Sequence, residues 1–548
     1  MDTRTPKVSN KPRLILLSST LLIISVVVLH RISVGEFHFN FDESVHACTG
    51  MYVADFVRTL PLTHPIKFTL LYYTHYPSLG LIHWPPVFYI TEGFAFLLGG
   101  LSVIPARAVI LLFTLIGCYF WFKTIEIFEN PYHAAVSTMV LGLLPSVLLY
   151  EKTVMLEVPS LAMCIAASYY WIRYLRWGHG RDLSFFVAMA ILALLTKQTS
   201  IYLFLFCVLT ILSEKKWRLV LDRSIWRGFG VFFLITAPFY IVALRFHSKF
   251  IQSDTLEAQT IGNPFAFYLR ALPDQLGMMI LCLSILGILT SIWWGKWETT
   301  RVMLAWILAC YLTMTAFAIK EPRYAIYWIP ALVYFAVGPF VSLRLPRLVR
   351  LAGGVVSLFL LAYSVVVGWV YERPYISGYA EAAEEVTKMS NSGFLLFDGE
   401  FPGNFIFFIH RFDPNRRFVV LRKALYTTRV LKERGSIEFI NNQEELENLI
   451  DLYGIRLIVV DNSKLEFESQ KLLRDHLQSP RFKLVHTVSI KTNIPEMQGR
   501  RLFVYENVQP TGCHLQSVHT EMMTLPFNID ISPTELGLEC GPSEFRVP

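Results

Sequence analysis

The sequence predicts a polytopic α-helical membrane protein with about eleven transmembrane helices and outer-face interfacial helices, followed by a soluble α/β domain. Only 17% of the 548 residues are charged and 54% are hydrophobic, whereas soluble domains carry about 25% charged residues. The long apolar runs end near residue 371, and short β-type runs then alternate with helical ones. We therefore expect a membrane domain over residues 1–371 and an extracytoplasmic domain over 372–548.

The first transmembrane helix is predicted at 14–29. Basic residues precede it (Arg4, Lys7, Lys11 and Arg13), and no small-x-small cleavage site follows it, so an uncleaved helix fits better than a signal peptide. A spanning helix needs about 20 mostly apolar residues. Ten later stretches meet that need approximately: 105–126, 131–150, 157–176, 182–196, 198–213, 227–246, 274–295, 301–319, 323–342 and 349–371.

The stretch 84–100 is ambiguous, because it is apolar but short, opens with a Pro pair and carries Glu92. If it lies in the interface, the most basic loops all fall on the side of the basic N-terminus, as the positive-inside rule requires. These loops are 173–181, 214–227, 296–301 and 343–350. We therefore predict a cytoplasmic N-terminus, an interfacial helix at 84–100, and an outer face that carries 32–104 and the tail.

Ionisable residues gather at the predicted outer boundary. Charged groups there are costly unless they snorkel, pair or serve a site. Snorkelling would explain any one of them, but their concentration on one face predicts a shared polar cavity. The residues are Asp42, Glu43, His83, Glu151, Lys152, Glu157, Lys197, Lys320, Glu321 and Arg323.

Two adjacent carboxylates, Asp42 and Glu43, open a stretch with helical rhythm that runs to Leu60. Asp42 would serve as the N-cap of that helix. The pair also suits catalysis, with Asp42 as a general base facing a bound hydroxyl and Glu43 orienting or tuning it. Nearby, His75 and His83 would face the same cavity, although an ordinary interfacial histidine is as good an explanation of His83.

Cations and a third carboxylate come from later outer turns. Glu157 begins a helix, where the helix dipole favours a carboxylate. Lys197 lies between two helices and close to the N-terminus of the second, which suits a lipid-linked phosphate. The guanidinium of Arg323 would donate two further hydrogen bonds to the same phosphate. The predicted sugar site comprises Glu157, Lys152, Tyr324 and His75.

These groups suit glycosyl transfer from a lipid carrier. An acceptor hydroxyl attacks the anomeric carbon, a carboxylate takes its proton, and fixed positive charge meets the departing phosphate. The main alternative is a transporter or flippase of a lipid-linked sugar, which predicts charges through the bilayer depth rather than at one rim. A catalytically inactive scaffold for the tail would not need these residues together.

The ordered set of motifs resembles the C superfamily of glycosyltransferases (GT-C). It consists of Asp42-Glu43 after the first span, the Pro pair of the interfacial helix, Glu157-Val-Pro, Leu-Thr-Lys197 and Arg323-Tyr324. Over about 10–345 the chain is most similar to the protein mannosyltransferase family (glycosyltransferase family 39) and its bacterial relatives, the lipid A aminoarabinose transferases. The resemblance implies an inverting enzyme that uses a polyprenyl-phosphate (undecaprenyl- or dolichyl-phosphate) monosaccharide.

By that resemblance Asp42 is the catalytic base, Glu43 is its neighbour in the acceptor site, and Lys197 and Arg323 contact the donor phosphate. Two positions depart from the family pattern. His83-Trp84 precedes the Pro pair where relatives often have Lys, so the His83 phosphate contact becomes pH-sensitive. Glu157 stands where Asp is common.

The expected partners are the lipid donor, a lipid, glycan or protein acceptor, and membrane lipids. Nucleic acid is not expected, because the densest basic run is a short loop between apolar stretches. Aminoarabinose transferases can hold zinc, but no His/Cys cluster here has ligand spacing, so no cofactor or metal is predicted. By analogy, a bacterial inner membrane is expected, since the chain lacks the large luminal insertion of eukaryotic relatives.

The tail is predicted to be a compact α/β domain. Its expected strands are 394–397, 405–409, 418–421, 457–460, 484–490 and 502–505, and its expected helices are 378–390, 442–453 and 464–478. The loop 398–404 is expected to be a plain turn, and 508–548 to be irregular and peripheral. Cys513 and Cys540 would form a disulfide only in an oxidising compartment, and the sequence leaves that open.

Overall fold

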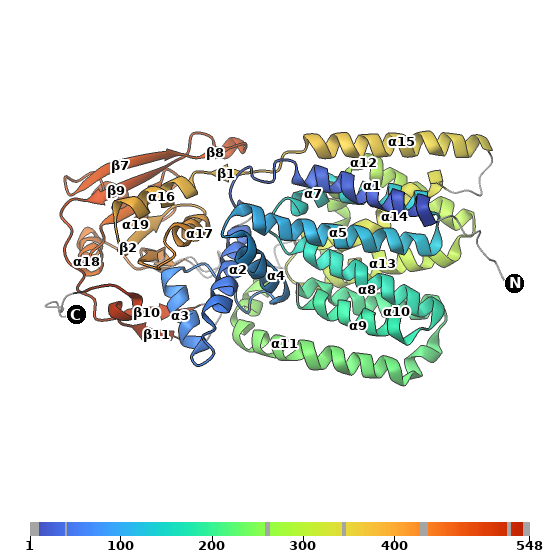
Figure 1. The fold of residues 1–548 in the computed structure, drawn as a ribbon, viewed down its shortest axis with the longest axis horizontal. Helices are drawn as coiled ribbons and strands as arrows, with labels where there is room; N and C mark the ends of the chain where they lie inside the picture. The colour runs from blue at the N-terminus through green and yellow to red at the C-terminus, as the bar shows by residue number, and fades with distance from the viewer. Residues whose placement is uncertain are drawn as a thin grey trace. The chain divides into compact units, whose positions relative to one another are not determined.

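The computed structural model describes residues 10–38, 41–257, 263–341, 347–422, 424–427, 437–522 and 528–540. Arg4, Lys7 and Arg344, which contributed to the topology prediction, lie outside these ranges. The chain divides into two compact units (Figure 1). Unit 1 comprises Met1–Ile32, Trp84–Phe88 and Arg107–Arg373, and unit 2 comprises Ser33–His83, Tyr89–Ala106 and Pro374–Pro548. Most of the predicted outer segment, apart from Ile32 and Trp84–Phe88, is therefore grouped with the tail.

Unit 1 is helical and has a helix at each of the eleven predicted spans. Its α-helices are α1 Asn10–Leu29, α5 Val103–Phe128 (which begins in unit 2), α6 Pro131–Gly142, α7 Pro145–Glu151, α8 Glu157–Trp177, α9 Gly180–Leu194, α10 Tyr202–Ser213, α11 Arg223–Glu257, α12 Pro264–Trp293, α13 Trp297–Ala316, α14 Ile329–Val341 and α15 Arg347–Val370. Short 3-10 helices connect some of them: η1 Gln198–Ile201, η2 Trp217–Leu221 and η4 Pro322–Trp328.

The chain is a multi-pass membrane protein. Within the described residues, six helices are long and apolar enough to cross a bilayer, or seven if the bent pair α6 and α7 forms one span. By helix length and apolar composition, the described residues do not reach the predicted number of about eleven transmembrane helices. One reason is that α9, α10 and α14 have only 15, 12 and 13 residues. The full count of spans stays a prediction.

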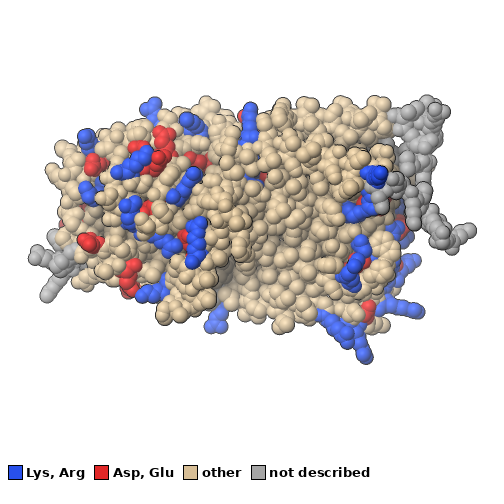
Figure 2. Space-filling model, in the orientation of Figure 1, with Lys and Arg blue, Asp and Glu red and all other residues tan. Residues whose placement is uncertain are grey.

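Charged side chains are unevenly distributed over the visible surface of the helical unit (Figure 2). The lateral face of this unit is almost without charged side chains, and Lys and Arg gather at one of its ends (Figure 2). Arg176, at the last turn of α8, contacts Glu298 at 2.5 Å, and Lys216 donates to the carbonyl of Leu175. Three of the predicted basic loops therefore meet at one end of unit 1. Glu157 begins the same helix and lies about 30 Å away along it.

Unit 2 combines the outer segment with the α/β tail. Its α-helices are α2 Asp42–Thr59, α3 Pro65–His75, α4 Val87–Gly99 (which begins in unit 1), α16 Tyr379–Met389, α17 Pro402–Phe412, α18 Gln443–Tyr453 and α19 Glu468–His476. Its strands are β1 Ile376–Ser377, β2 Gly393–Asp398, β3 Phe418–Leu421, β4 Tyr426–Thr427, β5 Ile437–Glu438, β6 Leu457–Asp461, β7 Phe482–Ser489, β8 Lys491–Thr492, β9 Arg501–Asn507, β10 Val518–Glu521 and β11 Asn528–Ile531.

The central sheet of unit 2 has the strand order β3-β2-β6-β9-β7. The β2–β3 and β2–β6 pairs are parallel, and β9 runs antiparallel to β6 and β7. Five of the six predicted strands and all three predicted helices of the tail are confirmed within a few residues. Buried residues such as Leu396, Ile458 and Leu473 form its core.

Two predictions for the tail are wrong. Residues 405–409 belong to helix α17, whose first turn carries Pro402 and whose apolar side chains are almost all buried. The periodicity of a short continuous apolar run does not distinguish a buried helix from a buried strand. The described residues of 508–540 are neither irregular throughout nor merely peripheral, since β10 pairs with β11 and Ile531 and Leu536 join the core. The structure also pairs Cys513 with Cys540 in a disulfide.

The predicted outer helices lie close to their expected positions. Helix α2 starts at Asp42, and its N-cap is Phe41 in the left-handed region, so the prediction that Asp42 caps the helix is wrong. Helix α4 has 13 residues, which is about 20 Å and too short to cross a bilayer of about 30 Å alone. Its length supports the interfacial assignment of 84–100.

Candidate functional site

A buried ion cluster in unit 1 brings together three of the predicted site residues. The Lys197 ammonium donates to Glu157 Oε1 at 2.5 Å, and Arg323 Nε lies 3.5 Å from the same oxygen. The side chains of Glu157 and Lys197 are only 1% and 6% exposed. One carboxylate oxygen therefore binds two cations in a region of low dielectric, where such contacts are strong.

Two neighbours complete this cluster. Arg323 Nη2 donates to Glu321 Oε1 at 2.9 Å, and Arg323 Nε lies 2.6 Å from Glu321 Oε2, so the guanidinium lies between two carboxylates. The ring of Tyr324 lies 5.3 Å from the Lys197 ammonium and 5.7 Å from the Arg323 guanidinium, within cation–π range. Two carboxylates balance two cations here. The sequence placed Glu321 at the outer boundary without assigning it a role.

A layer of hydroxyl groups holds the three contributing segments together. Ser160, one turn after Glu157 in α8, bonds to Ser200 of η1 at 2.7 Å and to Tyr327 of η4 at 2.9 Å. Thr199 and Tyr327 bond at 2.7 Å. Each partner is buried, so each bond satisfies polar groups that would otherwise be costly. This network explains why Glu157, Lys197 and Arg323 meet.

Lys152 follows α7 and precedes the helix that Glu157 begins. Its side chain is buried, and the pKa of Lys152 is lowered to about 8, chiefly by burial and also by the charges of Arg373 and Arg31, while the charge of Glu151 opposes the shift. Lys152 therefore loses its charge at a lower pH than an exposed lysine does.

In unit 2, Asp42 and Glu43 occupy the first turn of α2. Asp42 is partly exposed, whereas Glu43 is fully buried and accepts from the His38 amide at 2.8 Å. Glu92 of α4 is fully buried as well, and its pKa is raised well above the ordinary value by burial and then by the charge of Glu43. We conclude that Glu92 is a neutral carboxylic acid beside the Asp42-Glu43 pair.

The close approach of α2 and α4 depends on a glycine. A Cβ at Gly50 would overlap the Glu92 carboxyl group. Among the described residues, neither Glu92 oxygen has a hydrogen-bond partner. On the same two helices, His46 Nδ1 and the Tyr89 hydroxyl bond at 2.8 Å. Sequence reasoning assigned no role to Glu92, although an acid within an apolar interfacial stretch is a functional-site signal.

The two predicted histidines have different surroundings. His75 ends α3, is buried, and bonds through Nδ1 to the carbonyl of Phe418 in β3 at 2.8 Å. Burial lowers the pKa of His75, so it is neutral at pH 7. His83 is half-buried in the turn before α4. Of the nine predicted residues, Glu157, Lys197, Arg323, Tyr324 and Lys152 lie in unit 1 and Asp42, Glu43, His75 and His83 in unit 2.

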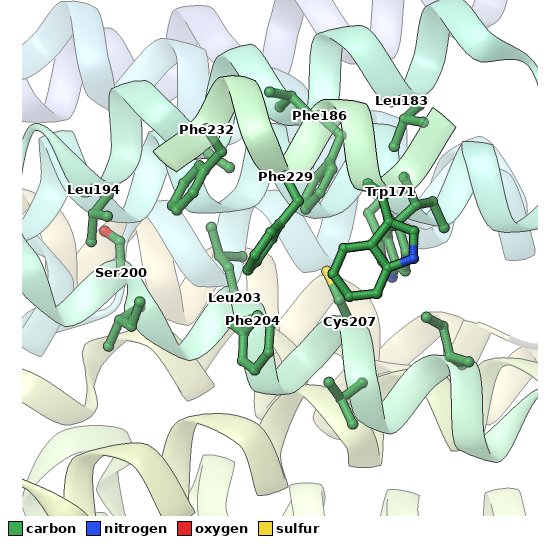
Figure 3. A pocket seen from close by; sticks show the side chains of 18 of the residues that line it. Trp171, Leu183, Phe186, Leu194, Ser200, Leu203, Phe204, Cys207, Phe229 and Phe232 are labelled. Atoms are coloured by element: carbon green, nitrogen blue, oxygen red, sulfur yellow. The ribbon is translucent and has the colours of Figure 1, made fainter. Parts of the chain in front are cut away.

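An apolar pocket of about 300 Å³ lies among α8, α9, α10 and α11 of unit 1 (Figure 3). Its lining includes Leu194, Ser200 and Ile201, which are close to Lys197 in the sequence. Trp171 of α8 and Phe229 of α11 also line it. The walls are almost wholly apolar, so the pocket suits a hydrocarbon chain rather than a polar ligand.

In the part of the chain that the structure describes, no three His, Cys, Asp or Glu side chains form a group that could hold a metal ion.

Comparison with known proteins identifies the fold. Residues 83–242 match the family model described as dolichyl-phosphate-mannose-protein mannosyltransferase. ArnT from Cupriavidus metallidurans bound to undecaprenyl phosphate has a TM-score of 0.55 and 13% identity, over 92% of this chain and 99% of ArnT. The chain has a GT-C-like helical fold.

Two further structures agree with this GT-C-like fold. The apo state of the same ArnT has a TM-score of 0.58 and 14% identity, over 91% of this chain and 98% of ArnT. The oligosaccharyltransferase AglB from Archaeoglobus fulgidus, in complex with an inhibitory peptide and a dolichol-phosphate, has a TM-score of 0.51 and 12% identity, over 91% of this chain and 74% of AglB. No curated protein sequence matches the chain. At these identities the structural likeness shows the fold alone.

Proposed function

We propose that this protein is an integral-membrane glycosyltransferase. It transfers a monosaccharide from a polyprenyl-phosphate donor to a hydroxyl or phosphate acceptor on the extracytoplasmic face, with inversion. The observation that carries the proposal is the buried cluster of Lys197, Arg323 and Glu157 in a chain with a GT-C-like fold. The acceptor is a lipid, a glycan or a protein, and the membrane is a bacterial inner membrane with the N-terminus in the cytoplasm.

The proposed reaction is a single displacement. For a hydroxyl acceptor, the oxygen attacks the anomeric carbon, and its proton passes to the carboxylate of Asp42. The bond between that carbon and the phosphate oxygen breaks, and the electron pair stays on the phosphate. Attack from the side opposite the leaving group inverts the anomeric centre. The partial exposure of Asp42 supports its role as the base, because a base must reach its substrate.

Lys197 and Arg323 receive the leaving phosphate. The donor is a phosphodiester with one negative charge, and the departing polyprenyl phosphate gains a second as the bond breaks. Fixed cations therefore stabilise the transition state more than the bound donor. Glu157 supports this role by holding both cations in place before the charge develops. His83 would contribute a further phosphate contact.

The rest of the donor fits the remaining features of unit 1. The apolar pocket beside Leu194 and Ser200 would receive the start of the prenyl chain. Glu157, Lys152 and Tyr324 are the proposed contacts of the sugar. The role of His75 in that site stays a prediction, because its buried bond to Phe418 supports a part in holding α3 to β3.

The test is a transfer assay with purified full-length protein and a panel of labelled polyprenyl-phosphate monosaccharides, followed by product analysis. We expect product with at least one donor, and a loss of about 10²- to 10⁴-fold for Asp42→Asn, the usual contribution of a general base. Asp182→Asn is the control, because Asp182 is a buried carboxylate that binds Arg173 at 3.0 Å at the basic end of unit 1.

Transfer that survives Asp42→Asn unchanged would remove the assigned base. Movement of the intact labelled donor across liposomes, without product and without a need for Asp42, would identify a flippase instead.

A further inference from the structure

A buried clamp holds helix α2 thirteen residues beyond Asp42. Asp55 of α2 receives a contact of 2.6 Å from His410 Nε2 of α17. Arg416, which follows α17, lies 3.2 Å from the same carboxylate oxygen, and the Tyr72 hydroxyl of α3 donates to that oxygen at 3.2 Å. Asp55 and His410 are 7% and 4% exposed at their side chains. Three segments of unit 2 therefore converge on one carboxylate of α2.

The clamp carboxylate is ionised at neutral pH. Burial alone would raise its pKa, but the hydrogen bond and charge of His410 and the charge of Arg416 outweigh burial and hold the pKa of Asp55 below its ordinary value. An ionised carboxylate only accepts hydrogen bonds, so His410 Nε2 must carry the proton that it shares with Asp55. Such charge-assisted bonds are roughly twice as strong as neutral ones.

A second set of contacts joins α17 to Phe37, which precedes α2, and to Ser44 in the first turn of α2. The side-chain amide of Asn404 accepts from the Phe37 amide at 3.0 Å and donates to the Phe37 carbonyl. Gly403 approaches Ser44 so closely that a Cβ would overlap the Ser44 hydroxyl. Both ends of α2 thus rest on the same helix of the tail, and α17 sets the direction of α2.

We propose that His410 and Arg416 are positioning residues for glycosyl transfer: by clamping Asp55 they hold α2 in the orientation that presents Asp42. The α/β tail thereby contributes to catalysis without touching substrate. This inference rests on the proposed function, because it needs Asp42 to be the base.

The length of α2 makes the clamp effective. Asp42 and Asp55 are separated by about 20 Å along the helix, at about 1.5 Å per residue. A tilt of about 5° at the clamp would therefore move the first turn by about 1.7 Å, and a misplacement of about 1 Å can lower a rate roughly 100-fold. The two cations proposed for the donor phosphate, Lys197 and Arg323, lie in unit 1, so donor binding should depend little on the clamp.

The experiment compares His410→Phe with His410→Gln in the full-length protein, with the labelled donor that yields product. The Gln amide can donate to Asp55 from nearly the place of Nε2, whereas Phe cannot. We expect kcat to fall about 10- to 100-fold for His410→Phe. For His410→Gln we expect a fall of less than about threefold, since the donor to Asp55 is kept. The KM for the donor should stay within about threefold in both, because the clamp acts on the acceptor-side base.

Asp398→Asn is the matched control. Asp398 is a buried carboxylate of unit 2 that binds Arg474 at 2.7 Å, and its described bonds go to segments of the tail rather than to α2. It should lower thermal stability while leaving kcat unchanged. An equal loss of kcat in Asp398→Asn, or an unchanged kcat in His410→Phe, would overturn the proposal.

Arg416→Gln provides a second variant if His410→Phe does not fold, since the Arg416 side chain is 26% exposed and tolerates change better. It should lower kcat in the same direction, and an unaltered kcat would count against the clamp.

Hydrogen exchange of the backbone amides at the start of α2 separates the two proposals. Faster exchange there in His410→Phe, but not in Asp398→Asn, supports the clamp whether or not Asp42 is the base. The absence of product with every donor in the panel would reject the proposed function, and transfer that persists in Asp42→Asn would remove the assigned base. Unaltered exchange in His410→Phe rejects the clamp.

Discussion

Two buried carboxyl groups, Glu157 in unit 1 and Glu92 in unit 2, have opposite surroundings. Glu157 lies 2.5 Å from Lys197 and 3.5 Å from Arg323. Glu92 is equally buried, but within the described residues its two oxygens have no hydrogen-bond partner, and its nearest charged influence is another carboxylate, Glu43. The two cations therefore balance the charge of Glu157 despite its burial, whereas burial without such a partner raises the pKa of Glu92 well above its ordinary value.

These different surroundings of Glu157 and Glu92 fit the different roles proposed for the two units. Lys197 and Arg323 are fixed in place by Glu157 and Glu321, so as donors they can meet the developing charge of a leaving phosphate without moving. A neutral acid beside Asp42 and Glu43 adds no negative charge there, so a base can ionise next to it. The predictions below test this contrast, beginning with the largest expected effect.

Removing one partner of the unit 1 cluster should have the largest effect. Lys197→Met leaves Glu157 buried with the more distant Arg323, and breaking a buried ion pair in this way costs about 3 kcal/mol or more. We expect a lower thermal unfolding temperature and loss of transfer. The double variant Lys197→Met/Glu157→Gln should recover most of the stability but none of the transfer. Recovery of both would show that the pair is structural only.

In unit 2 the packing around Glu92 can be tested with a substitution that creates a steric overlap. Gly50→Ala places a methyl group against the Glu92 carboxyl, and overpacking of this kind costs about 1–3 kcal/mol. Adding Glu92→Ala should relieve the overlap and restore the unfolding temperature. Gly354→Ala is the control, since a Cβ there meets open space. If Gly50→Ala is as mild as that control, α2 and α4 do not pack as described.

The smallest expected effect concerns Lys152. Its charged fraction falls as pH rises through its pKa of about 8, so a rate that needs the ammonium should be about tenfold lower at pH 9 than at pH 7. Lys152→Arg stays charged and should remove this alkaline decline. The control is Lys388→Arg, an exposed lysine of α16, which should keep the wild-type pH profile. An identical decline in all three proteins would exclude Lys152 as its source.

Much of the membrane unit could be predicted from the sequence, because hydropathy and helix ends are local properties. Apolar runs located a helix at every expected span, and Glu157 does begin α8 as predicted. Three of the four predicted basic loops meet at one end of the unit. Prediction failed where one local pattern is compatible with two structures. The apolar run 405–409 forms a buried helix instead of a strand, and Asp42 is the first residue of its helix instead of the N-cap.

The sequence by itself determined that the chain is a multi-pass membrane protein with ionisable groups concentrated in a few turns, since composition and hydropathy depend only on which residues follow one another. Tertiary structure alone decided the partners: Lys197 with Glu157 forty residues away, His410 with Asp55 across 355 residues, and Glu92 with no partner among the described residues. The physical reason is that a charge is stabilised by what packs against it, and packing joins segments whose distance along the chain carries no information about their distance in space.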